Sequence, residues 1–143
     1  MSNVNANTIR AANGSLGTDI RIKNTSLYES DGGTSVTQNL VQGLGKSWCD
    51  WNQVGTQAIR DSFNISGITD GGTGKTTVAI ANDMASGNWA GVIYQSGYGS
   101  DGFDNNYAGG LDQKSASSCR LTAYASNLID AYLCTLMVMG DLA

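Results

Sequence analysis

The sequence predicts an all-β protein: a small antiparallel β-sandwich, jelly-roll-like, preceded by an extended N-terminal arm. Its 143 residues include 19 glycines and no proline, and many Thr, Ser, Asn and Asp residues separate short apolar runs. This composition favours strands joined by tight turns over a helical bundle. A hydrophobic content of 41% and a mean hydropathy of −0.19 are typical of a globular chain that buries one core.

Residues 1–45 are predicted to form an arm that does not fold alone. Every aromatic residue except Tyr28 lies at Trp48 or beyond it, so the large side chains belong to residues 46–143. The arm is polar, and its segment 36–44 fits either a short helix or an extended linker. Because it cannot bury enough apolar surface to offset its ordering entropy, we expect it to serve trimerisation or attachment. Residues 46–143 are expected to form the sandwich domain.

The strands of the sandwich domain are predicted from alternating apolar and polar runs that turn residues separate. The expected ranges are 46–52, 57–68, 75–82, 88–96, 105–112, 116–125 and 130–139. The most continuously apolar run, residues 132–139, indicates a central or subunit-facing strand. Its two methionines, Met137 and Met139, are assigned to core or interface packing rather than to a ligand-binding stripe.

The run Asp-Gly-Gly-Thr-Gly-Lys-Thr-Thr at residues 70–77 is superficially like a nucleotide-binding loop. A phosphate-binding loop needs G-x-x-x-x-G-K-[ST] between a buried strand and the N-terminus of a helix. Here Thr69 occupies the first glycine position, and the residues after Lys75 alternate and are rich in β-branched side chains, as in a strand. The sequence therefore predicts a β-hairpin at this point rather than a phosphate site.

The charge and the reactive residues argue against several kinds of function. A net charge of −4 gives no basic footprint, so nucleic acid is not expected as the main partner. Histidine, the usual general base and metal ligand, is absent, and the 12 acidic residues are scattered through turns. Cys49, Cys119 and Cys134 form no C-x-x-C pair and are expected to pack as small apolar residues. We therefore predict no enzymatic activity, no catalytic residue and no cofactor.

Targeting signals are not evident in the chain. No run approaches the ~20 apolar residues of a membrane-spanning helix. The first residues lack the basic and then apolar profile of a signal peptide. We expect a soluble protein that is made in a cytoplasm and has no membrane partner.

A recurring residue pattern begins at position 46. The residues that match it are Lys46, Trp48, Trp51, Asn52, Gly55, Thr56, Ile59, Arg60, Asp61, Ser62, Phe63, Asn64, Ser66, Ile68, Thr69, Asp70, Gly72, Thr73 and Gly74, continued by Thr77, Val78, Asn88, Trp89 and Ala90. Through them the chain resembles a domain of phage structural proteins, common at the C-terminal ends of tail-fibre-like proteins, including those of marine phages. Lys75 departs from the pattern, which has an acidic or neutral residue there. The resemblance implies a small β-sandwich that assembles as a homotrimer in a virion.

The longest loop-like segment, residues 95–110, is the predicted recognition site. The candidate ligand-binding residues are Tyr98, Asp101, Phe103, Asp104, Asn105, Asn106 and Tyr107. Aromatic faces beside short polar side chains suit carbohydrate or protein recognition, although a Gly-rich loop with buried aromatics accounts for the same residues. Asp101, Asp104 and Asn106 could also gather around Ca²⁺, but their spacing is not that of an EF-hand, and we assign no metal site. The tryptophans are expected in the core: Trp48, Trp51 and Trp89.

Two functions follow as expectations from the resemblance. The first is a short trimeric tail-fibre or fibre-tip module that binds a host surface glycan or another tail protein. The alternative is a trimeric capsid decoration protein that stabilises the head, which the absence of a long repetitive shaft favours. Both place the protein in the virion after synthesis in the host bacterial cytoplasm, with itself and other virion proteins as partners.

Overall fold

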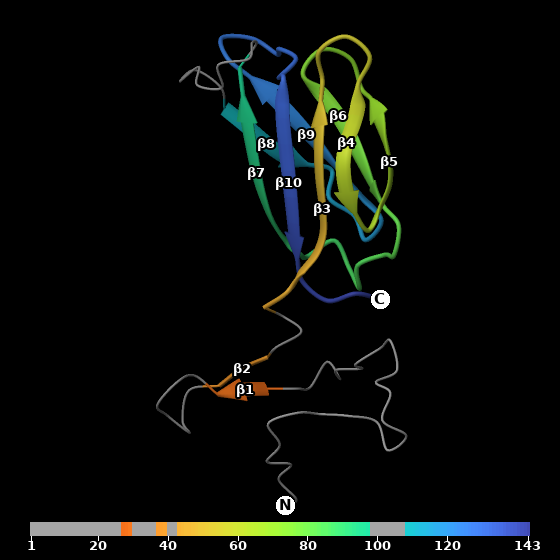
Figure 1. Cartoon of the computed structure of the whole chain (residues 1–143), viewed down its shortest axis with the longest axis vertical. Helices are drawn as coiled ribbons and strands as arrows, with labels where there is room; N and C mark the ends of the chain where they lie inside the picture. The colour runs from red at the N-terminus through yellow and green to blue at the C-terminus, as the bar shows by residue number, and fades with distance from the viewer. Residues whose placement is uncertain (1–26, 30–36, 40–42, 98–107) are drawn as a thin grey trace, which may run out of the picture.

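The computed structural model describes residues 27–29, 37–39, 43–97 and 108–143 of the chain. Within these ranges all the regular secondary structure consists of β-strands, and all paired strands are antiparallel. Two four-stranded sheets lie face to face, with their strands along the long direction of the sandwich (Figure 1). The predicted all-β sandwich is therefore confirmed.

The two sheets draw their strands from different parts of the chain. The first sheet has the order β4-β3-β10-β7 and the second the order β5-β6-β9-β8. The strands of the first sheet are β3 (Gly45–Asn52), β4 (Ala58–Phe63), β7 (Ala90–Ser96) and β10 (Leu133–Met139). The strands of the second sheet are β5 (Ile65–Asp70), β6 (Lys75–Ile80), β8 (Ala108–Asp112) and β9 (Ser118–Tyr124). In the first sheet β10, the last strand, pairs with β3, the first strand of the sandwich.

The single strand predicted over residues 57–68 is wrong, because the chain changes sheets at Asn64. This residue has a φ of 55°, a left-handed conformation that Asn tolerates better than most residues. Its side chain donates from Nδ2 to the carbonyl oxygen of Lys46 at 3.0 Å and accepts at Oδ1 from the backbone N–H of Asn82 at 2.8 Å. These bonds hold the corner between β4 and β5.

The described part of the arm consists of two short strands. β1 (Leu27–Glu29) pairs with β2 (Thr37–Asn39) as a two-stranded sheet. The short helix considered for residues 36–44 is therefore wrong at residues 37–39, which form a strand.

The core lies between the two sheets and is built by alternation along each central strand. On β6, for example, Thr76, Val78 and Ile80 are buried, whereas the residues between them are partly exposed. The buried apolar residues are Cys49, Trp51, Val78, Ile80, Met84, Trp89, Cys119, Leu121, Ala123, Ala131, Cys134, Leu136 and Val138. Trp51 and Trp89 lie in the core, as predicted.

The three cysteines are free thiols buried in this core. Burial raises the pKa of Cys49 to about 12, that of Cys119 to about 11 and that of Cys134 to about 12. Because a thiol reacts as its thiolate, these side chains are unreactive at neutral pH in the folded protein. The prediction that they pack as small apolar residues is confirmed.

The hairpin predicted around residues 70–77 is also confirmed, because β5 and β6 pair on either side of this turn. The backbone N–H of Lys75 donates to the carbonyl oxygen of Gly72 at 2.9 Å, and that of Gly74 donates to Oδ1 of Asp130 at 2.6 Å. Thr76 is buried, and its Oγ1 accepts from Nε1 of Trp51 at 3.2 Å. The Gly-Lys-Thr sequence therefore leads into a strand and has a structural role.

Candidate interaction surface

Four apolar side chains cross the outer face of the first sheet in one row, which we call the apolar row. Strand register places Phe63 (β4) opposite Trp48 (β3), Trp48 opposite Met137 (β10), and Met137 opposite Val92 (β7). Phe63 is 55% exposed, Met137 47% and Val92 59%, and Trp48 is half-buried. Each strand of the sheet contributes one member, so the row is continuous from edge to edge.

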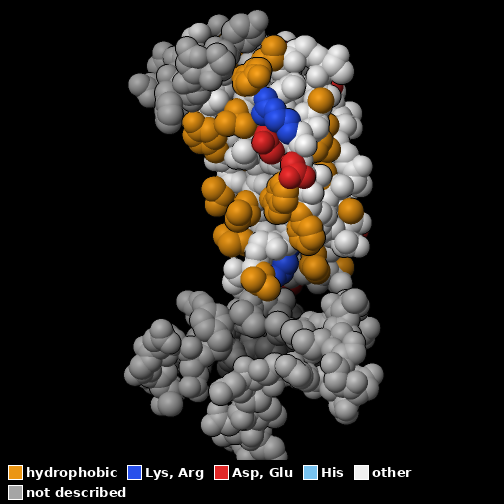
Figure 2. Space-filling view, viewed as in Figure 1, with side chains coloured by type: hydrophobic (Ala, Val, Ile, Leu, Met, Phe, Trp, Pro, Cys, Tyr) orange, Lys and Arg blue, Asp and Glu red, His pale blue; other side chains and the backbone are white. Residues whose placement is uncertain are grey.

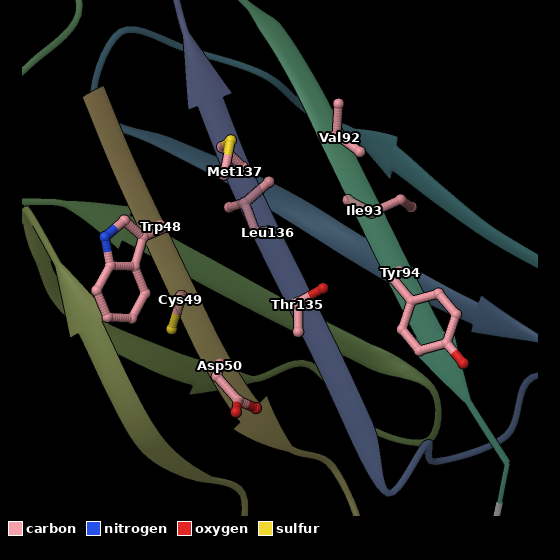
Figure 3. Close-up of a pocket in the computed structure, with 9 residues that line it drawn as sticks. All are labelled: Trp48, Cys49, Asp50, Val92, Ile93, Tyr94, Thr135, Leu136 and Met137. Atoms are coloured by element: carbon pink, nitrogen blue, oxygen red, sulfur yellow. The ribbon is translucent and has the colours of Figure 1, made fainter. Parts of the chain in front are cut away.

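A shallow groove runs beside the apolar row. Trp48 and Tyr94 lie on opposite sides of strand β10, and Met137 and Thr135 lie between them (Figure 3). The groove has a volume of about 360 Å³ and also contacts Asp50. Its surface is mostly apolar, so it suits an apolar or aromatic side chain of a partner rather than an ion.

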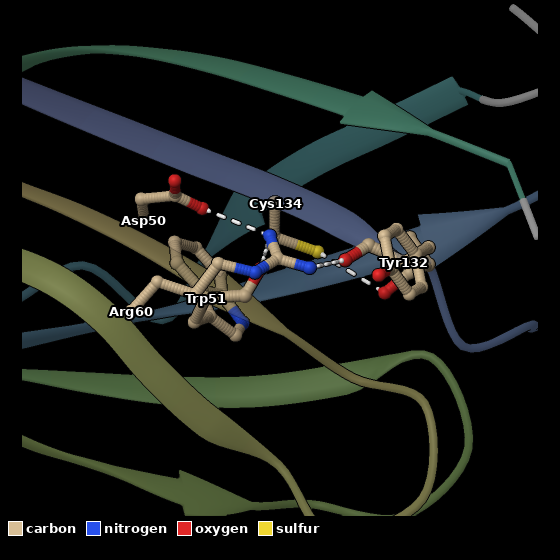
Figure 4. Close-up of polar contacts among 6 residues, drawn as sticks. Asp50, Trp51, Arg60, Tyr132 and Cys134 are labelled. Carbon is tan, nitrogen blue, oxygen red and sulfur yellow. Dashed lines mark hydrogen bonds and ion pairs between the residues drawn. The ribbon is translucent and has the colours of Figure 1, made fainter. Parts of the chain in front are cut away.

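The outer face also carries a polar cluster centred on Arg60 (Figure 4). Nη1 of Arg60 donates to Oδ1 of Asp50 at 3.1 Å, and Nη2 donates to the carbonyl oxygen of Tyr132 at 2.6 Å. The guanidinium also stacks 4.9 Å from the centre of the Tyr132 ring. Arg60 sits where the pairing between β3 and β4 shifts register. Since the ion pair is about one-third exposed, its contribution to stability is only ~0–1 kcal/mol. The guanidinium balances the negative charge of the Asp50 carboxylate on this face.

Figure 2 shows this outer face from the front: hydrophobic side chains gather over it around a group of basic and acidic side chains, and another basic side chain lies farther down. The outer face of the second sheet has the opposite character. At its centre lies a polar row of four residues joined by strand register: Thr69, Thr77, Arg120 and Asp112. Arg120 holds Asp112 through two hydrogen bonds, of 2.9 and 2.5 Å. The hydrogen bond from Arg120 lowers the pKa of Asp112.

The predicted recognition residues lie outside the described part of the chain, so their role stays a prediction. They are Tyr98, Asp101, Phe103, Asp104, Asn105, Asn106 and Tyr107. Trp48, which was expected in the core, instead lies on the outer face, because its neighbours Ser47 and Cys49 take the inward positions of β3. The sequence identified Met137 as a core or interface residue, but not the partners that register brings beside it.

The described ranges contain no candidate metal centre. They contain no group of three or more Cys, Asp or Glu side chains placed to hold a metal ion. No helix long and apolar enough to cross a membrane occurs among the same residues. Comparison with protein-family models, curated proteins and solved structures gave no match.

Proposed function

We propose that this protein is a structural component of a phage virion that acts as a homotrimeric tail-fibre or fibre-tip module and binds a host surface glycan or another tail protein. We assign it no enzymatic activity and no cofactor. The observation that carries the proposal is the apolar row on the outer face of the sheet β4-β3-β10-β7.

The apolar row supports an assembly role because the exposure of its apolar side chains to water is energetically unfavourable. Fully burying a side chain such as Val, Phe or Met contributes about 1.5–3 kcal/mol each. Phe63, Val92 and Met137 are each about half exposed in the single chain, so much of that free energy is still to be gained. Contiguous apolar patches on a surface mark interaction sites. A subunit of a larger particle would bury such a patch against its neighbours.

The residues that carry the phage resemblance also contribute to this surface. Trp48 and Phe63 are two of the matching positions, and both belong to the apolar row. Arg60, another matching position, forms the polar cluster beside it. Residues of the phage-like pattern therefore lie on the same outer face that we propose as the interaction surface. The jelly-roll-like connectivity, the trimer and glycan binding by residues 98–107 stay predictions.

Two measurements on the full chain test this proposal. Sedimentation equilibrium gives the mass, which is expected to be three times the chain mass of 14.9 kDa. Antibodies against residues 43–143, applied to intact particles from the phage that encodes the chain, are expected to label the tail in electron micrographs. Labelling of the head would favour the decoration protein instead. A stable monomer together with unlabelled particles would overturn the proposal.

A further inference from the structure

We infer that three copies of the chain pack around a three-fold axis, with the outer face of the sheet β4-β3-β10-β7 turned toward the axis. The inference rests on the proposed function and names the surface through which the copies meet. It also names the residues nearest the axis, Trp48 and Met137.

These two residues are central because of the strand order. β3 and β10 are the inner strands of the sheet, so Trp48 and Met137 lie on either side of its midline. Phe63 and Val92 lie on the edge strands β4 and β7. A sheet that faces an axis with its midline closest to it brings Trp48 and Met137 of each copy together.

The width of the sheet fits three copies. Neighbouring strands lie ~4.8 Å apart, so four strands make a face about 19 Å wide. If three such faces form the sides of a prism with an equilateral triangular cross-section, the middle of each face lies about 5.5 Å from the three-fold axis. Sheets that pack face to face are ~10 Å apart, which leaves about 5 Å for the side-chain layer of each sheet. One layer of outward side chains from each copy therefore fills the prism.

The area of the face argues against a simple face-to-face pair. With β10 seven residues long and a rise of ~3.3 Å per residue, the face covers about 440 Å² of projected surface. Stable interfaces bury about 800 Å² on each partner. In a three-fold ring each copy meets two neighbours, and edge strand β4 of one copy lies beside β7 of the next. This contact between two different edges adds area, and it closes into a ring.

The charges on the face are compatible with contact between acidic chains. Each chain carries a net charge of −4, but none of the four side chains of the apolar row is charged. Asp50, the acidic residue on central strand β3, is paired with Arg60 at 3.1 Å. Asp61 also lies on this face, exposed on edge strand β4 opposite Asp50. Three copies therefore bring no unpaired carboxylate of β3 to the axis, and the carboxylate of Asp61 lies at the edge of the face. In this arrangement the three β3 strands begin side by side at Gly45, at one end of the prism.

The test compares matched substitutions on central strands of the two sheets. Met137→Asp places a carboxylate on the apolar face, and Thr77→Asp places one at an outward position of β6. Both variants are first checked for a wild-type circular dichroism spectrum. In sedimentation equilibrium Met137→Asp is expected to fall from three times 14.9 kDa to 14.9 kDa, whereas Thr77→Asp stays at the wild-type mass.

A second measurement does not depend on disrupting the assembly. Met137→Cys, treated with a short bis-maleimide, is expected to yield a covalently linked dimer within the trimer, because two of the three thiols near the axis are joined. Thr77→Cys is expected to yield none, and the buried native thiols do not react.

A wild-type trimer that survives Met137→Asp and does not cross-link through Met137→Cys would overturn this inference and leave the proposed function standing. A wild-type dimer that Met137→Asp dissociates would overturn the three-fold arrangement. A wild-type monomer would remove the trimeric function and the inference together.

Discussion

The two sheets bury one shared core but present different outer faces. The apolar row crosses the sheet β4-β3-β10-β7, and the polar row crosses the sheet β5-β6-β9-β8. In each row the residues are register partners, one from each of the four strands. A sandwich needs only its inner faces to be apolar, and a sheet with one solvated face has polar residues on that side. The second sheet follows this rule and the first does not. This difference is the basis on which we propose that the apolar row is buried against a partner.

The largest expected effect separates the inner and outer residues of one strand. Leu136 is 2% exposed and Met137 is 47% exposed on β10. Leu136→Ala is expected to lower the free energy of unfolding by about 2–5 kcal/mol, because it leaves a cavity in the core. Met137→Ala is expected to cost less than about 1 kcal/mol at a concentration where the chain is monomeric. Urea denaturation followed by tryptophan fluorescence measures both. Equal losses would mean that Met137 already packs within the single chain.

A smaller loss of stability is expected from substitutions in the turn between β5 and β6. Gly74 has a φ of 69°, and a Cβ there would lie 2.6 Å from the carbonyl oxygen of Ala123. Gly72 has a φ of 89° but open space around it. Gly74→Ala is expected to cost at least ~2 kcal/mol and Gly72→Ala about 1 kcal/mol, because both incur backbone strain but only the first has a steric clash.

Thermal and urea unfolding of the two glycine variants check this difference. A Gly74→Ala variant as stable as Gly72→Ala would contradict the packing of the turn against residues 123–130. Binding of labelled ATP to the wild type that Lys75→Ala abolishes would contradict the structural interpretation of the turn altogether.

The smallest effect concerns the ion pair in the polar row. Arg120 lowers the pKa of Asp112 below 3.8, chiefly through its hydrogen bonds. The folded state therefore favours the carboxylate, and the stability this contributes is present above about pH 4 and is lost as the pH falls through the folded pKa. Arg120→Gln is expected to raise the pKa of Asp112 toward 3.8, as measured by NMR of its carboxyl carbon. Arg60→Gln, on the apolar face, serves as the control and should leave that pKa unchanged. A shift in the control alone would contradict the assignment of the pair.

Strand positions could be predicted from the sequence where one face of a strand is solvated. Along β6, buried Thr76, Val78 and Ile80 alternate with partly exposed residues, and the predicted strand and hairpin are confirmed. The change of sheet at Asn64 could not be predicted, because Phe63-Asn64-Ile65 continues the alternation of apolar and polar residues. The left-handed φ of Asn64 does not alter that alternation.

The apolar row could not be predicted for a different physical reason. Residues 133–139 are apolar at nearly every position, and a continuous apolar run does not reveal which side chains face the core. Only strand register shows that Met137 faces outward and that Trp48, Phe63 and Val92, from three other strands, lie beside it. The predicted loop site at residues 98–107 lies outside the described residues and stays a prediction.

The pairing of β10 with β3 has a consequence for how the protein is made. Met137 lies between Trp48 and Val92 in the apolar row, and it belongs to β10, which follows β3 and β7 in the chain. During synthesis β3 leaves the ribosome long before its partner exists, so the first sheet can close only after translation of β10. A chain terminated early lacks the middle of the interaction surface. The apolar row is therefore complete only once the sheet β4-β3-β10-β7 has folded.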